Sequence, residues 1–160
     1  MRKTDSDSKP PMHAKRLGRE LAMTFLFSCE LKKVLPGFAE FELFIDSVRD
    51  EFSLTDTRDN RRAQEYAVKL YEAVTCNKER IDGIISRCCR NWDMERLSTV
   101  DCNIMRVAVA EMAEFPEVPV VVSIDEAVEI ARDYSGSEAG NFVNGVLNAV
   151  KDSEFQGKSK

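Results

Sequence analysis

The chain has 160 residues, of which 43% are hydrophobic and 32% are charged, a balance typical of one globular domain that excludes fibrous and disordered proteins. No apolar run approaches the roughly 18 residues of a membrane span. Residues 1–11 offer no apolar core for a signal peptide, so we expect a cytoplasmic protein without membrane attachment. The net charge of −5 is uneven, because residues 1–20 carry +3. A basic start on an acidic body can meet a polyanion at one end.

The first three elements are predicted to be helices, because their apolar residues recur every three to four positions. The first runs from Ala14 to about Leu31, with Lys15, Arg16 and Arg19 in its opening turns. Pro36 and Gly37 end this pattern. Two further helices follow, separated by a polar break over residues 55–60, and their inward stripes are Phe41, Ile45, Val48 and Phe52, then Ala63, Ala67, Leu70 and Val74.

Capping signals place the starts of the next helices. Asn77 is suited to cap a fourth helix, because its side-chain oxygen can accept a free amide of the first turn. Ser98 and Asp101 resemble a capping box that opens a fifth helix, which two prolines end at residues 116 and 119. Ser123 and Glu126 form a second capping box, and we expect a sixth helix to begin there.

The short segment Val118–Val122 is rich in β-branched residues, as strands are. No second such run exists to pair with it, so we expect an extended connector. After a break around Gly136, a last helix carries Phe142, Val143, Val146, Leu147 and Val150. The sequence thus predicts an all-α fold of about seven helices in two small packed bundles. We expect a flexible tail over residues 1–12, the helical domain over 13–152 and a second flexible tail over 153–160.

The sequence offers little for catalysis. The single histidine, His13, lies at the edge of the expected tail, so a serine or cysteine nucleophile has no base. No glycine-rich phosphate loop is present. Five cysteines without a C-x-x-C pair argue against disulfides and zinc: Cys29, Cys76, Cys88, Cys89 and Cys102. We therefore predict that the protein is not an enzyme and uses neither a cofactor nor a metal, with a thiol redox role for Cys88 and Cys89 as a minor alternative.

Two local features suggest binding. Lys15 and Arg19 are spaced i and i+4 and can present two positive charges to phosphates from one helix face, with Arg16 beside them. Near the other end, Asn141, Asn144 and Gly145 interrupt an amphipathic helix at a cost in helix propensity, which suggests either a site or close helix packing against Gly145.

At this point the residues resemble a known family. The run of Asn91-Trp92, Arg96-Leu97, Asp101, Ile104-Met105-Arg106, Val118-Pro119, Ser123 to Glu129, and Phe142-Val143-Asn144-Gly145-Val146-Leu147 looks like the signature order of the NusB family. The opening, Lys15 to Ala22, resembles that family's arginine-rich start. The resemblance extends from about Ala14 to Val150, and several motifs in the same order are more specific than any one of them.

The resemblance implies an RNA-binding transcription antitermination protein. Such a protein pairs with NusE, a small-subunit ribosomal protein, binds the boxA element of ribosomal RNA leader transcripts, and joins an antitermination complex on RNA polymerase. It also implies that the last helix packs beside the first, so that Asn141 and Asn144 add hydrogen bonds to an RNA face made by Lys15, Arg16 and Arg19. Reversing Arg16 and Arg19 to Glu should then abolish RNA binding and leave helicity unchanged.

Departures from the family pattern lower the expected RNA affinity. Leu17 interrupts the basic run, in which Lys15 replaces one arginine, Asn141 stands where a basic residue is common, and Asp125 replaces an asparagine. Phe27 also stands where a tyrosine is common. The main alternative function is a helical adaptor or homodimer that binds protein alone. We further expect Trp92 to fill the joint between the two helical halves, because so large an apolar side chain favours burial.

Overall fold

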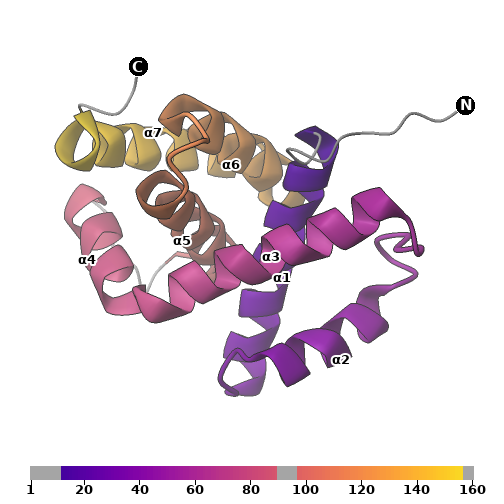
Figure 1. Cartoon of the computed structure of the whole chain (residues 1–160). Coiled ribbons are helices and arrows are strands. Elements are labelled where there is room, and N and C mark those ends of the chain that lie inside the picture. Colours follow the sequence, from indigo (N-terminus) through magenta and orange to yellow (C-terminus); the bar gives the residue numbers. More distant parts are fainter. Residues whose placement is uncertain (1–11, 90–96, 157–160) are drawn as a thin grey trace, which may run out of the picture.

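The computed structural model describes residues 12–89 and 97–156. These residues form seven α-helices and no strand: α1 (Met12–Lys32), α2 (Phe38–Val48), α3 (Arg58–Cys76), α4 (Lys78–Cys88), α5 (Thr99–Glu114), α6 (Val120–Ser135) and α7 (Ser137–Glu154). The prediction of an all-α fold is confirmed. Helices α1 to α3 form one group and α4 to α7 a second group beside it (Figure 1). Trp92 lies outside the described residues, so its predicted place at the joint stays a prediction.

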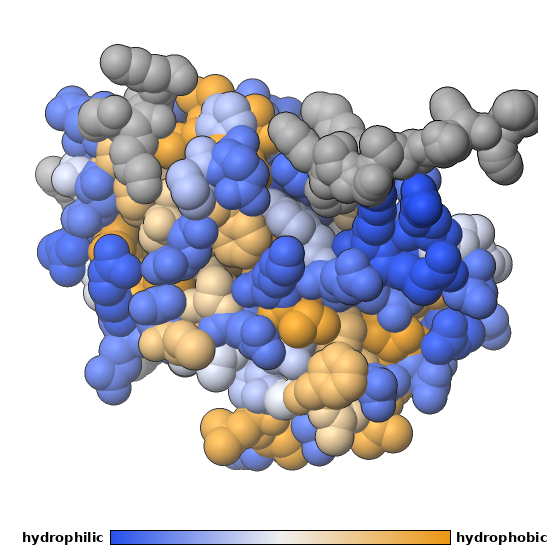
Figure 2. All heavy atoms as spheres, in the orientation of Figure 1, coloured by the Kyte–Doolittle hydropathy of each residue, from blue (hydrophilic) through white to orange (hydrophobic). Residues whose placement is uncertain are grey.

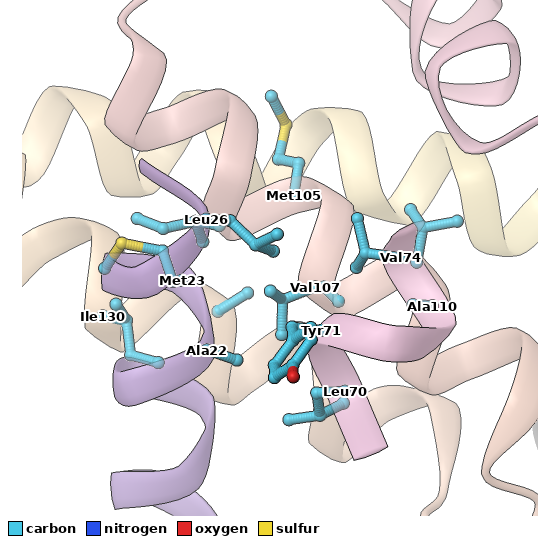
Figure 3. Packing of buried hydrophobic residues seen from close by; sticks show 14 of the residues in the cluster. Ala22, Met23, Leu26, Leu70, Tyr71, Val74, Met105, Val107, Ala110 and Ile130 are labelled. Atoms are coloured by element: carbon cyan, nitrogen blue, oxygen red, sulfur yellow. The ribbon is translucent and has the colours of Figure 1, made fainter. Parts of the chain in front are cut away.

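Helix α5 joins the two groups. Every residue from Cys102 to Met112 is buried, which makes α5 the central helix rather than a surface helix with one apolar stripe. It packs against α1 and α3 on one side and against α4, α6 and α7 on the other. Close up, Ala22 and Met23 of α1 and Tyr71 of α3 gather around Val107 of α5 (Figure 3). The two groups therefore share one hydrophobic core.

An aromatic cluster fills the first group of helices. The Phe25 ring of α1 lies 5.1 Å from the Phe41 ring in a T-shaped arrangement, and 4.8 Å from the Tyr71 ring. The Phe44 ring lies 5.4 Å from the Phe25 ring and completes the cluster. Such edge and offset contacts add about 0.5–1.5 kcal/mol per pair beyond burial. The short helix α2, which has few other neighbours, is thus attached to the body through its aromatic side.

Of the three predicted caps, the one at Ser98 forms, and those at Asn77 and Ser123 do not. Ser98 caps α5 as expected, since its hydroxyl accepts from the Asp101 amide at 3.0 Å. Asn77 does not cap α4, because its side-chain amide donates back to the Ala73 carbonyl of α3 at 2.8 Å. An additional cap is found at Thr57, whose hydroxyl accepts from the Asn60 amide at 3.2 Å. The polar break before α3 therefore contains its start signal.

The prediction of an extended connector over Val118–Val122 is wrong for its last three residues. Helix α6 begins at Val120, directly after Pro119. Val120 is buried and Val121 is 47% exposed, as neighbours on a helix at a surface are. Ser123 is buried inside the helix and does not cap it, because its hydroxyl donates to the Glu111 carboxylate at 2.7 Å. Composition alone suggested extended chain, but the burial pattern follows the helical period.

The C-terminal tail was predicted to begin too early. Helix α7 continues through Ser153 to Glu154, and Phe155 after it is 6% exposed and belongs to the core. The polar residues from Ser153 onward suggested a tail, but burial of one further aromatic side chain holds the last helical turn in place. The domain therefore extends at least to Phe155.

Gly18 allows α1 and α3 to approach each other closely. A Cβ atom at this position would lie 2.9 Å from the Ala63 carbonyl oxygen and 3.0 Å from the Tyr66 side chain. Gly145, for which close packing was predicted, has no atom within 4 Å of an added Cβ. That prediction is wrong, because Gly145 lies on the exposed side of α7.

The two glycines should respond oppositely to alanine. Gly18→Ala should lower the free energy of unfolding by roughly 1–3 kcal/mol, the usual cost of overpacking. Gly145→Ala should leave it unchanged or raise it by up to about 1 kcal/mol, because alanine has the higher helix propensity. Urea denaturation followed by circular dichroism measures both. Equal stability of the two variants would contradict the close packing of α1 on α3.

Candidate nucleic-acid interface

A buried ion pair lies beneath the predicted RNA face at the start of α1. The Arg19 Nε of α1 donates to both carboxylate oxygens of Glu111 of α5, each at 3.0 Å, and the side chains are 5% and 1% exposed. Ser123 of α6 and the Tyr66 hydroxyl of α3 donate to the same carboxylate. Burial, with the Glu111 charge adding to it, raises the pKa of Tyr66. Four helices thus meet at one carboxylate.

Arg19 is consequently unavailable to RNA, and its assignment to the RNA face is wrong. The residue lies three positions before Ala22 and seven before Leu26, both buried, so it is on the core side of α1. Sequence reasoning had grouped it with Lys15 by spacing alone. A better signal was Glu111, which stands alone as an acid in the apolar run of α5 and needs a buried cation.

The Arg16 side chain is 23% exposed and is surrounded by carboxylates. Its Nε lies 2.9 Å from Glu20, and its terminal nitrogens lie 3.5 Å from Glu126, 3.4 Å from Glu129 and 2.9 Å from Asp133. The Arg16 guanidinium is therefore set among four negative charges, three of them on α6, and it shares Glu126 with Arg19, which also lies 3.5 Å from that carboxylate. This side of α1 is acidic on balance, which does not favour a phosphate backbone.

Lys15 lies on the other flank of α1, against α3. Its Nζ is 5.7 Å from the centre of the Tyr66 ring. Arg62 precedes Tyr66 by one turn on the same side of α3, and Arg58 precedes Arg62 by another turn. Both helices begin at this end, as the 3.2 Å distance between the His13 Nε2 and the Asp59 carboxylate also indicates. Basic side chains from two helix starts therefore gather here.

Asn141 and Asn144 are exposed on α7, as a binding role requires. The Asn144 side-chain oxygen accepts from the Asn148 amide at 3.0 Å. However, α7 packs mainly on α6, and α6 lies between α7 and α1 (Figure 1). The expectation that the last helix packs directly beside the first is wrong, because α6 lies between α1 and α7.

Arg132 of α6 is a cation that sequence reasoning missed. Its side chain lies across Gly140, where an added Cβ would be 2.5 Å from the Arg132 Cγ and 3.0 Å from its Nε. Gly140 directly precedes Asn141. The position of Asn141 is the one where the family pattern often has a basic residue. The signal in the sequence was a glycine inside an amphipathic helix, which marks a close approach by another group.

The described residues offer little support for metal or thiol redox chemistry. No group of three potential metal ligands occurs in the ranges 12–89 and 97–156. Burial raises the pKa of the Cys89 thiol to about 11, which is the opposite of what a reactive redox thiol needs. No helix in these ranges is long and apolar enough to span a bilayer.

The fold and these surfaces define an all-helical protein with a buried polar centre shared by four helices and with basic side chains at the starts of α1 and α3. The chain belongs to the NusB family, whose model matches residues 16–152. It is 35% identical to the transcription antitermination protein NusB of Acetivibrio thermocellus over 85% of this chain and 87% of that protein. The protein of the same name from Desulfotalea psychrophila is 36% identical over 88% of this chain and 96% of its own.

Solved structures agree with this assignment. A chain from a crystal structure of the antitermination factors NusB and NusE in complex with dsRNA matches with a TM-score of 0.73 and 27% identity, over 89% of this chain and 99% of that one. NusB of T. maritima matches with a TM-score of 0.70 and 29% identity, over 91% and 94% of the two chains.

Arg19 and Arg16 of α1 should differ in how much each contributes to the stability of the fold. Arg19→Gln should lower the free energy of unfolding by roughly 3–5 kcal/mol, because it leaves the buried Glu111 charge without its cation. Arg16→Gln should change it by no more than about 1 kcal/mol, because the ion pairs of Arg16 are partly exposed. Urea denaturation measures both values. The expectation that reversing Arg19 to Glu leaves helicity unchanged is withdrawn, since that change sets two buried carboxylates together.

Proposed function

We propose that the protein is a cytoplasmic, non-catalytic RNA-binding transcription antitermination factor that pairs with NusE and binds boxA-type RNA within an antitermination complex on RNA polymerase. The observation that carries this proposal is the match of 89% of the chain to a chain from the crystal structure of NusB and NusE in complex with dsRNA. The basic ends of α1 and α3 and the exposed amides of α7 support it, because they suit phosphates and bases respectively.

The phosphate contacts are assigned to the flank of α1 that faces α3. Lys15, Arg58 and Arg62 supply the positive charge there, in place of the predicted set of Lys15, Arg16 and Arg19. Both α3 arginines also have interactions of their own in the chain, but a guanidinium carries five N–H donors and can add a phosphate to an existing contact. The carboxylates around Arg16 direct the RNA backbone away from the α6 side.

A second set of contacts is assigned to α7 and its neighbour α6. Asn141 and Asn144 offer amide donors and acceptors to the edges of unpaired bases or to sugar hydroxyls. Arg132, held across Gly140, supplies the charge that Asn141 lacks. Phe142 packs against the core from its partly buried position, so it is not assigned as a stacking platform.

The partnership can be tested by measuring binding with purified components. Fluorescence anisotropy of a boxA RNA should show tighter binding by an equimolar mixture with NusE than by either protein alone. A scrambled RNA of the same length is the control. A purely protein-binding adaptor, the alternative function, would bind NusE without any effect on RNA.

The phosphate assignment is tested by charge reversal. Lys15→Glu combined with Arg62→Glu should weaken RNA binding at least about tenfold near 0.1 M salt and lower the slope of log K against log salt by about 2. Lys78→Glu with Arg80→Glu makes the same change of charge on α4, at the far side of the molecule (Figure 1), and should have little effect. If the two double variants bind RNA equally, the assignment to the α1–α3 flank is wrong.

A further inference from the structure

Helix α2 leaves a hollow open at the surface. Among the helices that the structure describes, α2 packs least closely against its neighbours, and it is attached through the buried side chains of Phe41, Phe44 and Ile45. A hollow of about 460 Å³ lies between α2 and α3. Phe38, Phe41 and Ile45 of α2 and Val68 of α3 form its apolar lining. The volume is that of a small binding pocket, so the hollow has room for a few large side chains from another molecule.

Exposed apolar side chains continue from the hollow over the end of the molecule. Seven large hydrophobic side chains are exposed among the described residues, and five of them fall between residues 31 and 43: Leu31, Val34, Leu35, Phe38 and Leu43. Figure 2 shows this apolar surface at the lower end of the molecule, over α2 and the end of α1. Phe38 is 59% exposed and belongs both to this surface and to the lining of the hollow. A contiguous apolar surface of this kind marks a site of interaction.

Both ends of α2 are held by turns, so this wall of the hollow has a fixed shape. Before α2, Lys33 adopts a φ of 60° and the Val34 amide donates to the Cys29 carbonyl at 3.0 Å. After α2, Ser53 adopts a φ of 54° and the next amide donates back to the Arg49 carbonyl at 2.8 Å. A surface that is already in its binding shape favours docking, because little ordering entropy is lost.

The rim of the hollow is acidic. Residues 38–56 hold six acidic side chains against one basic side chain, so this stretch carries a charge of −5. The acidic residues are Glu40, Glu42, Asp46, Asp50, Glu51 and Asp56. On the opposite wall, Glu65 of α3 is exposed and lines the hollow, as Glu42 does from α2. A negative rim attracts a positively charged partner and disfavours a negatively charged one.

Two arginines also line the hollow, but each of them already faces a carboxylate. The Arg49 Nη2 lies 2.8 Å from Asp46, and the Arg61 Nη1 lies 2.6 Å from Asp56. Within residues 12–89 and 97–156, neither of the two glutamates on the walls is part of an ion pair. The charge that the hollow offers to a partner is therefore negative.

An amphipathic helix with basic flanks has the chemistry that this surface accepts. The apolar stripe of such a helix anchors in a hydrophobic groove, and lysines or arginines beside the stripe face acidic rims. Helix α2 has 11 residues and is roughly 16 Å long, so a partner helix of three to four turns can lie along it. Residues 1–11 of this chain have no apolar side chains repeated at helical spacing, so they do not supply that stripe.

We propose that the hollow between α2 and α3 is a docking site for a basic amphipathic helix of a partner protein. Apolar side chains of that helix fill the hollow and cover Phe38, and its lysines or arginines face Glu42 and Glu65. Arg58 and Arg62, which belong to the proposed phosphate-binding flank, do not line the hollow. The docking site goes beyond the proposed function, and its test uses neither RNA nor NusE.

Binding of a synthetic peptide tests the docking site. A labelled peptide of about four helical turns, with leucines on one face and lysines beside them, should bind the full chain with a dissociation constant of about 100 μM or tighter. Fluorescence anisotropy near 0.15 M salt measures this constant. A peptide with the same residues in scrambled order forms no apolar stripe and should bind at least about tenfold more weakly.

A matched pair of variants locates the bound peptide. Phe38→Gln should weaken binding of the leucine–lysine peptide at least about tenfold, as loss of an apolar anchor does. Val121→Gln is the control, because Val121 is 47% exposed on α6, away from the hollow, and it should bind as the parent does. A parent that binds neither peptide, or an equal loss of binding in the two variants, overturns the proposal.

Charge reversal on the two walls tests the chemistry of the partner. Glu42→Lys combined with Glu65→Lys should weaken binding of the leucine–lysine peptide at least about tenfold and create binding of a leucine–glutamate peptide of the same pattern. Glu79→Lys with Glu138→Lys makes the same change of net charge on α4 and α7, and should keep the preference for the lysine peptide. If the two double variants behave alike, the peptide responds to the net charge of the molecule rather than to the hollow, and the proposal is wrong.

Sedimentation velocity tests the alternative occupant, a second copy of this chain. Under the proposal, Phe38→Gln leaves the sedimentation coefficient of the protein alone unchanged at every concentration. A dimer that is present in the parent and lost in Phe38→Gln would show that a second copy covers the hollow, and this result contradicts docking of a partner helix there.

Discussion

The buried contact between the Arg19 guanidinium and the Glu111 carboxylate is the constraint on which the arrangement of the helices depends. Removing two charges from water costs several kcal/mol for each ion, so the pair is tolerated only because its hydrogen bonds are satisfied. Tyr66 and Ser123 supply two of those bonds to Glu111. The four side chains come from α1, α3, α5 and α6, so displacing any one of these helices leaves a buried charge partly unpaired. Gly18, one residue before Arg19, brings α1 close enough to α3 for Tyr66 to take part.

The fold was predictable where apolar periodicity was strong. The seven helices and the start of α5 at Ser98 followed from spacing and capping residues. The start of α6 did not, because three successive valines resemble a strand when the buried neighbours Ile124 and Ala127 are left out of the window. The end of α7 was missed for a related reason: a single apolar residue, Phe155, follows a polar stretch, and only the tertiary core shows that it is buried.

The candidate site was predictable in composition but not in grouping. Spacing on one helix placed Lys15, Arg16 and Arg19 together, yet the three side chains point to α3, to the carboxylates of α6 and into the core. Partners distant in sequence decide these directions, since Glu111 is 92 residues from Arg19 and Asp133 is 117 from Arg16. A single helix carries no information about them. The approach of Arg132 to Gly140 joins two helices and was invisible for the same reason.

The separation of charge across α1 also has a consequence for how the molecule moves in solution. Lys15, Arg58 and Arg62 lie on one flank, whereas Glu129 and Asp133 extend from α6 on the other, 62% and 65% exposed. The body therefore has an electric dipole across its first helix. In the field of any polyanion, torque on that dipole turns the basic flank forward while the two molecules are still about a Debye length apart, roughly 10 Å at 0.1 M salt. Fewer encounters then begin in a wrong orientation, and this advantage fades as added ions shorten the range of the field.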